Sequence, residues 1–292
     1  MASQRIKKNK IGYYELVDKP TAKQLENFYK NQYFDSNNFE VKYSDEELFH
    51  KTISFIEAFE ICKVKTGTML DIGCGEGFSL DFFSRKGWDV LGLDYSKDGV
   101  ERHFPNQLNN LRTGDIYQQL DYIQNNSNVK FDLIICNNVL EHLLDPIDFI
   151  KRFKSLLSEN GIARIQVPND NSYLQKDAVN KGLAKELFWF APHEHMSYFT
   201  QDSLKELIVH CDLYVVELLG DFPIDFFLFN ESSNYLLNSD TGKNCHMARI
   251  RLDTLMAKAG SEKLVAFRRG LGNAGLGRNA IIYFSLIRDK NG

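Results

Sequence analysis

The chain of 292 residues is 43% hydrophobic and 25% charged, so it can bury a full core and is not expected to be disordered. A formal net charge of -4 supplies no positive field for DNA or RNA, and nucleic acid is not an expected partner. Five cysteines without a Cys-x-x-Cys pair argue against a disulfide framework and a thiolate zinc site, and favour a reducing, cytoplasmic location.

The N-terminal part predicts helices. Leu25, Phe28 and Tyr29 recur at helical spacing within residues 20–60, and Ser44-Asp-Glu-Glu47 has the capping-box pattern that starts a helix over residues 44–59. No apolar stretch of signal-peptide length follows the basic N-terminus, and the most apolar segment, 222–229, is far too short for a membrane span. We therefore expect neither secretion nor a membrane span.

From residue 68 onward, short apolar runs alternate with amphipathic segments, which is typical of a doubly wound α/β sheet. The predicted strands are 68–72, 88–93, 111–113, 131–136, 162–167, 214–219 and 280–287. The predicted helices between them are 78–85, 117–124, 147–157 and 202–211.

A long insertion separates the last two strands. A stretch of about sixty residues exceeds any ordinary connection and must carry its own structure. Residues from about 245 to 271 have helical spacing, interrupted around Gly260, so the insertion is predicted to be helical.

A glycine-rich loop follows the first strand, in Asp71-Ile-Gly-Cys-Gly-Glu-Gly77. Glycine permits positive φ and close approach of the backbone to a ligand. A dinucleotide site is the rival interpretation, but its usual spacing is Gly-x-Gly-x-x-Gly, whereas this loop has Gly-x-Gly-x-Gly.

Three further strand ends carry polar residues suited to an adenosine. Asp94 ends the second strand and can accept hydrogen bonds from a ribose diol, while Tyr95 can lie against an adenine. Asp115 and Ile116 follow the third strand and suit an adenine amino group and ring face. The fourth strand ends in the polar run that starts at Asn137.

These four elements resemble, over roughly residues 66–219, the class I S-adenosylmethionine-dependent methyltransferases, in the branch that includes tailoring enzymes of sugars and small metabolites. The resemblance implies a Rossmann-like, mostly parallel seven-stranded sheet, S-adenosyl-L-methionine as cofactor and S-adenosyl-L-homocysteine as product. It assigns cofactor contacts to Asp71, Gly73, Cys74, Gly75, Gly77, Asp94, Tyr95, Ser96, Asp115, Ile116, Asn137, Asn138, Val139 and His142. The helix that follows Gly77 would favour the methionine carboxylate at its N-terminus.

The acceptor is expected beside Pro192-His-Glu-His-Met-Ser-Tyr-Phe-Thr200. In an extended segment His193 and His195 project to the same side, and either can take the proton of an attacking hydroxyl. His195 is favoured because it lies in a segment similar to one in this methyltransferase branch; the alternative is that both histidines only hydrogen-bond their loop. No third ligand lies at short spacing, so no metal is predicted. Glu141-His142 offers a second candidate base.

The resemblance divides the chain into an N-terminal helical lid (1–65), a cofactor-binding core (66–219), an acceptor-side insertion (220–279) and the final strand with its tail (280–292). Arginines near the insertion could meet an acidic or phosphorylated acceptor, or could simply form a solvated face; they are Arg249, Arg251, Arg268, Arg269 and Arg278.

The predicted function is O-methylation of a small polar acceptor, favouring a hydroxyl of a nucleotide-activated or phosphorylated sugar in surface polysaccharide biosynthesis. Methylation of nitrogen, carbon or a phenol in another small metabolite is the alternative, for which the aromatic segment 222–229 offers room. A non-catalytic binding subunit is the third hypothesis. The sequence does not decide between a monomer and an oligomer.

Overall fold

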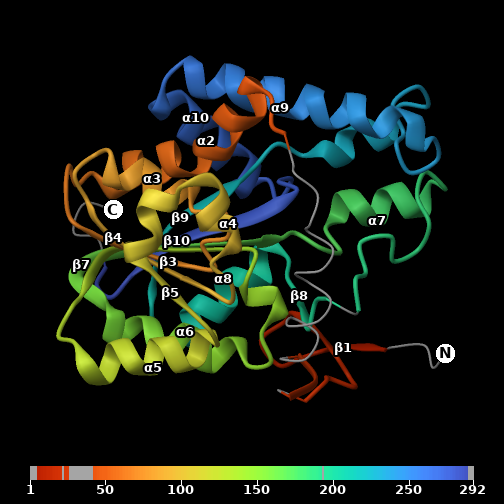
Figure 1. Ribbon diagram of the computed structural model, residues 1–292. Helices are drawn as coiled ribbons and strands as arrows, with labels where there is room; N and C mark the ends of the chain where they lie inside the picture. The colour runs from red at the N-terminus through yellow and green to blue at the C-terminus, as the bar shows by residue number, and fades with distance from the viewer. Residues whose placement is uncertain (1–4, 22, 26–41, 193, 289–292) are drawn as a thin grey trace.

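A computed structural model describes residues 5–21, 23–25, 42–192 and 194–288. Its central layer is a seven-stranded sheet with the order β5-β4-β3-β6-β7-β10-β9, covered by helices on both faces (Figure 1). The strands are β3 (Thr68–Ile72), β4 (Asp89–Asp94), β5 (Leu111–Thr113), β6 (Phe131–Asn137), β7 (Leu157–Pro168), β9 (Tyr214–Gly220) and β10 (Asn279–Ser285). Within this sheet β10 alone runs antiparallel to its neighbours, so the predicted mostly parallel, Rossmann-like sheet is confirmed.

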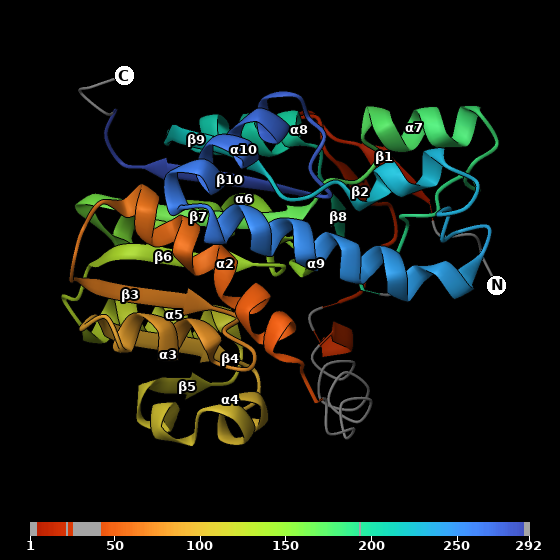
Figure 2. The same cartoon turned by 90° about the horizontal axis from the view of Figure 1, so that it is seen from above.

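One face of the sheet is covered by α2 (Asp45–Cys62), α3 (Phe78–Ser84) and α10 (Ser261–Asn273), and α9 (Gly242–Lys258) lies against α2 (Figure 2). Phe55, Phe83 and Val265 bury their side chains against strand residues such as Tyr283. The insertion is therefore helical, as predicted, and its two helices join at Gly260, where φ is 129°.

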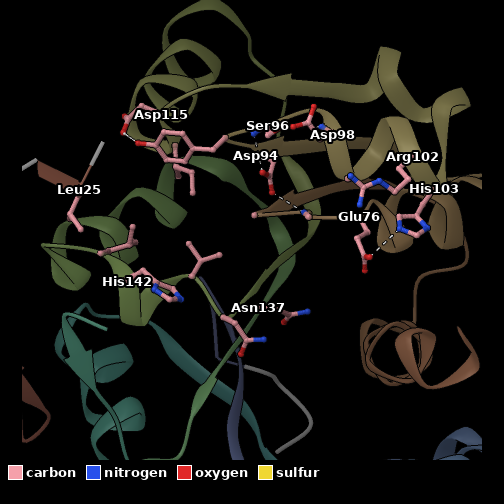
Figure 3. A pocket seen from close by; sticks show the side chains of 18 of the residues that line it. Leu25, Glu76, Asp94, Ser96, Asp98, Arg102, His103, Asp115, Asn137 and His142 are labelled. Atoms are coloured by element: carbon pink, nitrogen blue, oxygen red, sulfur yellow. Dashed lines mark hydrogen bonds and ion pairs between the residues drawn. The ribbon is translucent and has the colours of Figure 1, made fainter. Parts of the chain in front are cut away.

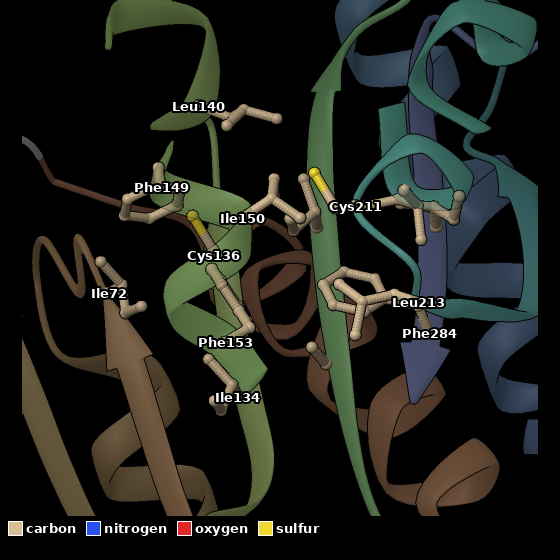
Figure 4. Close-up of a cluster of buried hydrophobic side chains, with 14 of the residues drawn as sticks. Ile72, Ile134, Cys136, Leu140, Phe149, Ile150, Phe153, Cys211, Leu213 and Phe284 are labelled. Atoms are coloured by element: carbon tan, nitrogen blue, oxygen red, sulfur yellow. The ribbon is translucent and has the colours of Figure 1, made fainter. Parts of the chain in front are cut away.

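The other face is covered by α5 (Ile116–Asn126), α6 (Pro146–Leu156) and α8 (Gln201–His210). Helix α6 begins at Pro146 because Asp145 caps its first turn, and Phe149, Ile150 and Phe153 then recur at helical spacing. These side chains pack against the sheet in the largest buried cluster (Figure 4), which holds the strand ends in place.

Several short elements carried no prediction. They include the helices α4 (Asp98–His103) and α7 (Tyr173–Asn180). Strands β1 (Ile6–Lys8) and β2 (Tyr14–Leu16) form a hairpin, and β2 pairs with β8 (Ser197–Tyr198). Short 3-10 helices are η3 (Pro105–Asn110), η4 (Leu140–His142), η5 (Ile224–Phe229) and η6 (Ser239–Thr241). The predicted helical residues Phe28 and Tyr29 lie outside the described residues.

A buried ionic network ties the insertion to the sheet. The Glu57 carboxylate of α2 accepts hydrogen bonds from Arg164 Nε of β7 (3.0 Å), Tyr283 OH of β10 (2.7 Å) and Arg268 Nη1 of α10 (2.6 Å). Arg268 also pairs with Asp253 of α9 at 3.5 Å. Two guanidinium groups thus share one carboxylate that is fully shielded from solvent.

Among the described residues, no helix is both long and apolar enough to cross a membrane.

Candidate active site

A cavity of about 720 Å³ opens at the carboxyl ends of β4, β3 and β6 (Figure 3). Parallel strands end at the same edge of a sheet, and ligands of open α/β sheets bind at that edge. The predicted cofactor residues that line it are Gly73, Gly75, Asp94, Tyr95, Ser96, Asp115, Ile116, Asn137, Asn138, Val139 and His142. The other three lie beside it: Asp71 and Cys74 line a neighbouring cavity of about 430 Å³, and Gly77 precedes α3.

The glycine loop has a conformation that only glycine adopts without strain. Gly73 has a φ of 79°, and a Cβ at this position would lie 2.4 Å from Cγ2 of Val139. Asp94 holds the loop from the next strand, because its Oδ2 accepts a hydrogen bond of 2.8 Å from the Gly75 amide. The loop backbone therefore forms one wall of the cavity, with no side chain between it and a ligand.

The carboxylates of Asp94 and Asp115 line the cavity. Asp94 Oδ1 accepts a hydrogen bond of 3.2 Å from the Ser96 amide, and burial raises the pKa of this carboxyl group. Asp115 caps α5 through the Gln118 amide and accepts a 3.1 Å hydrogen bond from Tyr95 OH. In Figure 3, Asp115 and Ser96 lie across the cavity from Asn137 and His142.

Behind the loop, Asp71 is nearly inaccessible to solvent and accepts a hydrogen bond from Ser79 Oγ. Burial raises the pKa of Asp71 to about 7. Its carboxyl group supports the loop from below and lies on the wall of the neighbouring cavity.

Three side chains from outside the glycine-rich loop meet Glu76 of the loop near Gly73, and the sequence did not point to them. Glu76 accepts hydrogen bonds from Lys51 Nζ (2.5 Å) and Tyr43 OH (2.8 Å), and His103 Nε2 lies 3.1 Å away. Lys51 and Tyr43 come from α2 and the segment before it, while His103 ends α4. Only the packing of these helices brings them to the loop, so no local spacing could have revealed them.

His142 lines the cavity, and the hydrogen bond of its ring shows which ring nitrogen carries the proton. Its Nδ1 donates a 2.8 Å hydrogen bond to the carbonyl oxygen of Glu194, which leaves Nε2 of the neutral ring unprotonated. Burial lowers the pKa of His142, so the ring is neutral at pH 7. Glu141 Oε1 lies 3.9 Å from Nε2, and burial raises the pKa of Glu141 to about 8, so this carboxyl group is mostly protonated.

His195 lies next to His142 and not on the wall of the large cavity. The two rings are 4.9 Å apart at their centroids, in an edge-to-face arrangement. Burial, together with His142 and Arg278, lowers the pKa of His195 to about 4, and its buried Nδ1 has no hydrogen-bond partner among the described residues. His193, the other predicted base, lies outside the described residues.

A possible ligand set for a metal emerges from this arrangement. Glu141, His142 and His195 each place one ligand atom within 4.8 Å of the others. Local spacing could not indicate this set, because Glu141 and His142 are distant from His195 in the chain. Glu141 would first have to release its proton.

The protonated Glu141 predicts a pH dependence of stability. With a folded-state pKa of about 8 against an ordinary value of 4.5, the folded chain keeps a proton that the unfolded chain has released. The free energy of unfolding of the wild type therefore falls as the pH rises from about 4.5 toward 8, because only the unfolded chain gives up the Glu141 proton in this range. Glu141→Gln resembles the protonated acid and has no such pH dependence. Its free energy of unfolding relative to that of the wild type should therefore be about 2 kcal/mol higher at pH 7.5 than at pH 6.0. Urea unfolding at these two pH values measures the difference; a constant difference would contradict a protonated Glu141.

Known sequences are similar to parts of this chain. The sequence model described as "Methyltransferase domain" matches residues 44–218. The ubiquinone biosynthesis O-methyltransferase of Vibrio cholerae is 29% identical over 161 residues, covering 52% of this chain and 63% of that protein. The protein of the same name from Actinobacillus pleuropneumoniae is 33% identical over 99 residues, covering 32% of this chain and 42% of its own. The matches thus span about half the length of these relatives.

Solved structures share the fold. A SAM-dependent methyltransferase from Archaeoglobus fulgidus superposes with a TM-score of 0.51 at 16% identity, covering 87% of this chain and 99% of its own. The plantazolicin methyltransferase BamL, solved with SAH, gives a TM-score of 0.51 at 14% identity, covering 89% and 93%. The chain therefore belongs to the methyltransferase domain family, and it shares its fold with a SAM-dependent methyltransferase.

Proposed function

We propose that this protein transfers a methyl group from S-adenosylmethionine to a hydroxyl oxygen of a small polar acceptor. The observation that carries the proposal is the neutral imidazole of His142, which lines the donor cavity and whose Nδ1 hydrogen bond leaves Nε2 unprotonated. A hydroxyl must lose its proton as it is methylated, and a neutral histidine is matched to that task. The matched relatives are named O-methyltransferases, which also favours oxygen as the methylated atom.

The cavity fits the cofactor in size and in chemistry. Its 720 Å³ is within the range of small-molecule sites, and its loop backbone at Gly73 is open to close approach. In our proposal Asp94 binds the ribose diol, Tyr95 and Ile116 contact the adenine, and Asn137 to Val139 lie beside the sulfonium. The other cofactor contacts predicted from the sequence stay predictions.

When bound, S-adenosylmethionine supplies an electrophilic methyl group and leaves as S-adenosylhomocysteine. His142 Nε2 takes the proton of the acceptor hydroxyl, and the Nδ1 hydrogen bond to Glu194 keeps the ring in position for this. The Glu141 carboxyl group lies 3.9 Å from Nε2, beside the imidazolium that then carries this proton. The residues that line the cavity would hold the hydroxyl oxygen in line with the methyl carbon and the sulfur atom, and this alignment is most of what a methyl displacement requires.

Two acceptor classes remain in the proposal. A sugar hydroxyl rests on the sequence resemblance, and a hydroxyl of a ubiquinone-type precursor is favoured by the names of the relatives. Incubation with donor carrying a labelled methyl group and a panel of phosphorylated sugars, catechols and amines separates them. Label transfer to a hydroxyl supports O-methylation, whereas transfer only to amines would overturn it. The cytoplasmic location stays a prediction.

Asp94→Asn tests the ribose contact. The amide keeps the shape but loses the charge and one acceptor oxygen, and a charge-assisted hydrogen bond contributes about 1.5 kcal/mol. Calorimetry should show about tenfold weaker binding of S-adenosylhomocysteine. Asp89→Asn is the matched control, because this exposed residue lies at the other end of β4. Equal affinities for the two variants would remove Asp94 from the site.

A further inference from the structure

The second cavity, of about 430 Å³, lies between the edge of the sheet and the helices α2, α9 and α10, and we call it the insertion-side cavity. Its lining includes Arg249 and Asp253 of α9, Arg268 of α10, Asp221 after β9 and Asn279 of β10. The insertion and the last strand therefore supply much of its wall.

The insertion-side cavity adjoins the donor cavity. The two share Lys51, Gly73, Glu76, Asn137 and Asn138 as wall residues. A molecule that occupies the insertion-side cavity would therefore lie next to the strand ends where we place the sulfonium. This is the position that a methyl acceptor needs.

The carboxylates of this cavity already have partners within the protein. Asp221 Oδ1 and Oδ2 accept hydrogen bonds of 2.6 Å each from the amide and the side chain of Asn279. Asp253 is bound by His50 at 3.0 Å and by Arg268 at 3.5 Å. Glu76 is bound by Lys51, Tyr43 and His103, and Asp71 by Ser79.

Several hydrogen-bond donors of this cavity, in contrast, have no acceptor among the described residues. Arg164 donates from Nη1 to Asn137 Oδ1 and from Nη2 to Gln166 Oε1 (3.1 Å). This fully buried guanidinium occupies both carboxamide oxygens. The two amide NH2 groups have no hydrogen-bond partner among the described residues and can donate to a ligand in the cavity that these residues line. Nε of Arg249 and of Arg268 is also buried without a partner among the described residues.

Arg249 differs from the other arginines in and near the insertion. Arg251 pairs with Glu46, Arg269 with Glu217, Arg278 with Asp170, and Arg268 with Glu57 and Asp253. Arg249 Nη2 contacts only the His246 ring, at 3.3 Å, and no carboxylate of the described residues is within ion-pair distance of it. Asp221 and Asp253 interact with Arg249 electrostatically but form no close ion pair with it, because each is held by other donors. A partly buried guanidinium of this kind is suited to bind an anion in two-point fashion.

We propose that the insertion-side cavity binds an anionic group of the methyl acceptor, a carboxylate or a phosphate, with Arg249 as its main ligand. This inference rests on the proposed methyl transfer, because it places the acceptor relative to the donor cavity. The leftover amides of Asn137 and Gln166 would donate to the same group or to its neighbouring oxygens. The acceptor is then a hydroxyl compound that carries negative charge at neutral pH.

Calorimetric titration of the full chain, saturated with S-adenosylhomocysteine, with sodium phosphate and separately with sodium benzoate tests this at constant ionic strength. We expect at least one of the two anions to bind, and Arg249→Gln to weaken that binding about tenfold. Phosphate binding alone indicates a phosphorylated acceptor, and benzoate binding alone indicates a carboxylated one. Arg251→Gln is the matched control, since Arg251 is exposed on the same helix, and it should bind the anion as the wild type does.

Arg249→Lys guards against a folding artefact, because it keeps the charge but loses the two-point geometry and should bind with intermediate affinity. Absence of binding by either anion, or equal binding by the wild type and Arg249→Gln, would overturn the proposal. Displacement of S-adenosylhomocysteine by the anion would also overturn it, since the cavity would then hold the donor carboxylate. Failure of S-adenosylhomocysteine itself to bind would instead contradict the proposed function.

Discussion

Glu57→Ala is expected to lower the free energy of unfolding by about 3–5 kcal/mol, because it removes one partner of a buried ion pair and leaves charge without compensation. The Glu57 carboxylate has no solvent exposure and binds Arg164 Nε, Tyr283 OH and Arg268 Nη1. Both guanidinium groups would lose this carboxylate in the variant. The two buried positive charges would then repel each other with no anion between them.

Urea unfolding at pH 7 measures this loss. Glu46→Ala in the same helix is the matched control, because Glu46 is exposed and its ion pair with Arg251 is long, at 3.5 Å. Exposed pairs contribute about 1 kcal/mol or less, so the control should unfold nearly as the wild type does. A loss for Glu57→Ala no larger than the loss for Glu46→Ala would show that the network is not important for stability.

His142→Gln is expected to lower kcat by about 100-fold or more, which is the usual range for removal of a general base. Glutamine can still donate a hydrogen bond toward the Glu194 carbonyl, but it has no basic nitrogen at neutral pH. Binding of S-adenosylhomocysteine should change little. Steady-state kinetics with an acceptor found in the panel, together with calorimetry, separate the two effects.

His195→Gln is the informative comparison. The sequence favoured His195 as the base, whereas in our proposal it supports His142 from behind, at a ring separation of 4.9 Å. We expect its replacement to lower kcat less than tenfold, well below the effect of a lost base. A larger loss for His195→Gln than for His142→Gln would return the role of base to His195.

Much of the fold could be predicted because its strands are short apolar runs separated by turns. Strands β3 and β5 have the predicted bounds, β4, β6 and β9 differ by one residue at one or both ends, and β7 and β10 differ by more. The pairing of β2 with β8 could not be predicted, because it joins Tyr14 to Tyr198 through backbone hydrogen bonds that depend on no local pattern. Helix α4 is short and has only one buried residue, Val100, so it has no apolar stripe to recognise.

The residues of the candidate donor site could be predicted from the sequence because of the topology of the sheet. Parallel strands end at one edge, so Gly73, Asp94 and Asn137 had to come together once the strands were identified. Lys51 and Arg249 could not be placed in the same way, because they reach the site from helices whose packing depends on buried contacts distant in sequence. The acceptor position that we propose therefore depends on the packing of these helices.

Titration of the purified chain with S-adenosylhomocysteine in a calorimeter tests whether the cavity at Gly73 and Asp94 binds the cofactor. We predict binding of one equivalent with a Kd in about the micromolar range. Assays with S-adenosylmethionine should in addition show product formation that depends on an acceptor. Absence of binding heat at millimolar ligand, together with absence of donor turnover, would contradict the assignment of the cavity at Gly73 and Asp94 to this cofactor.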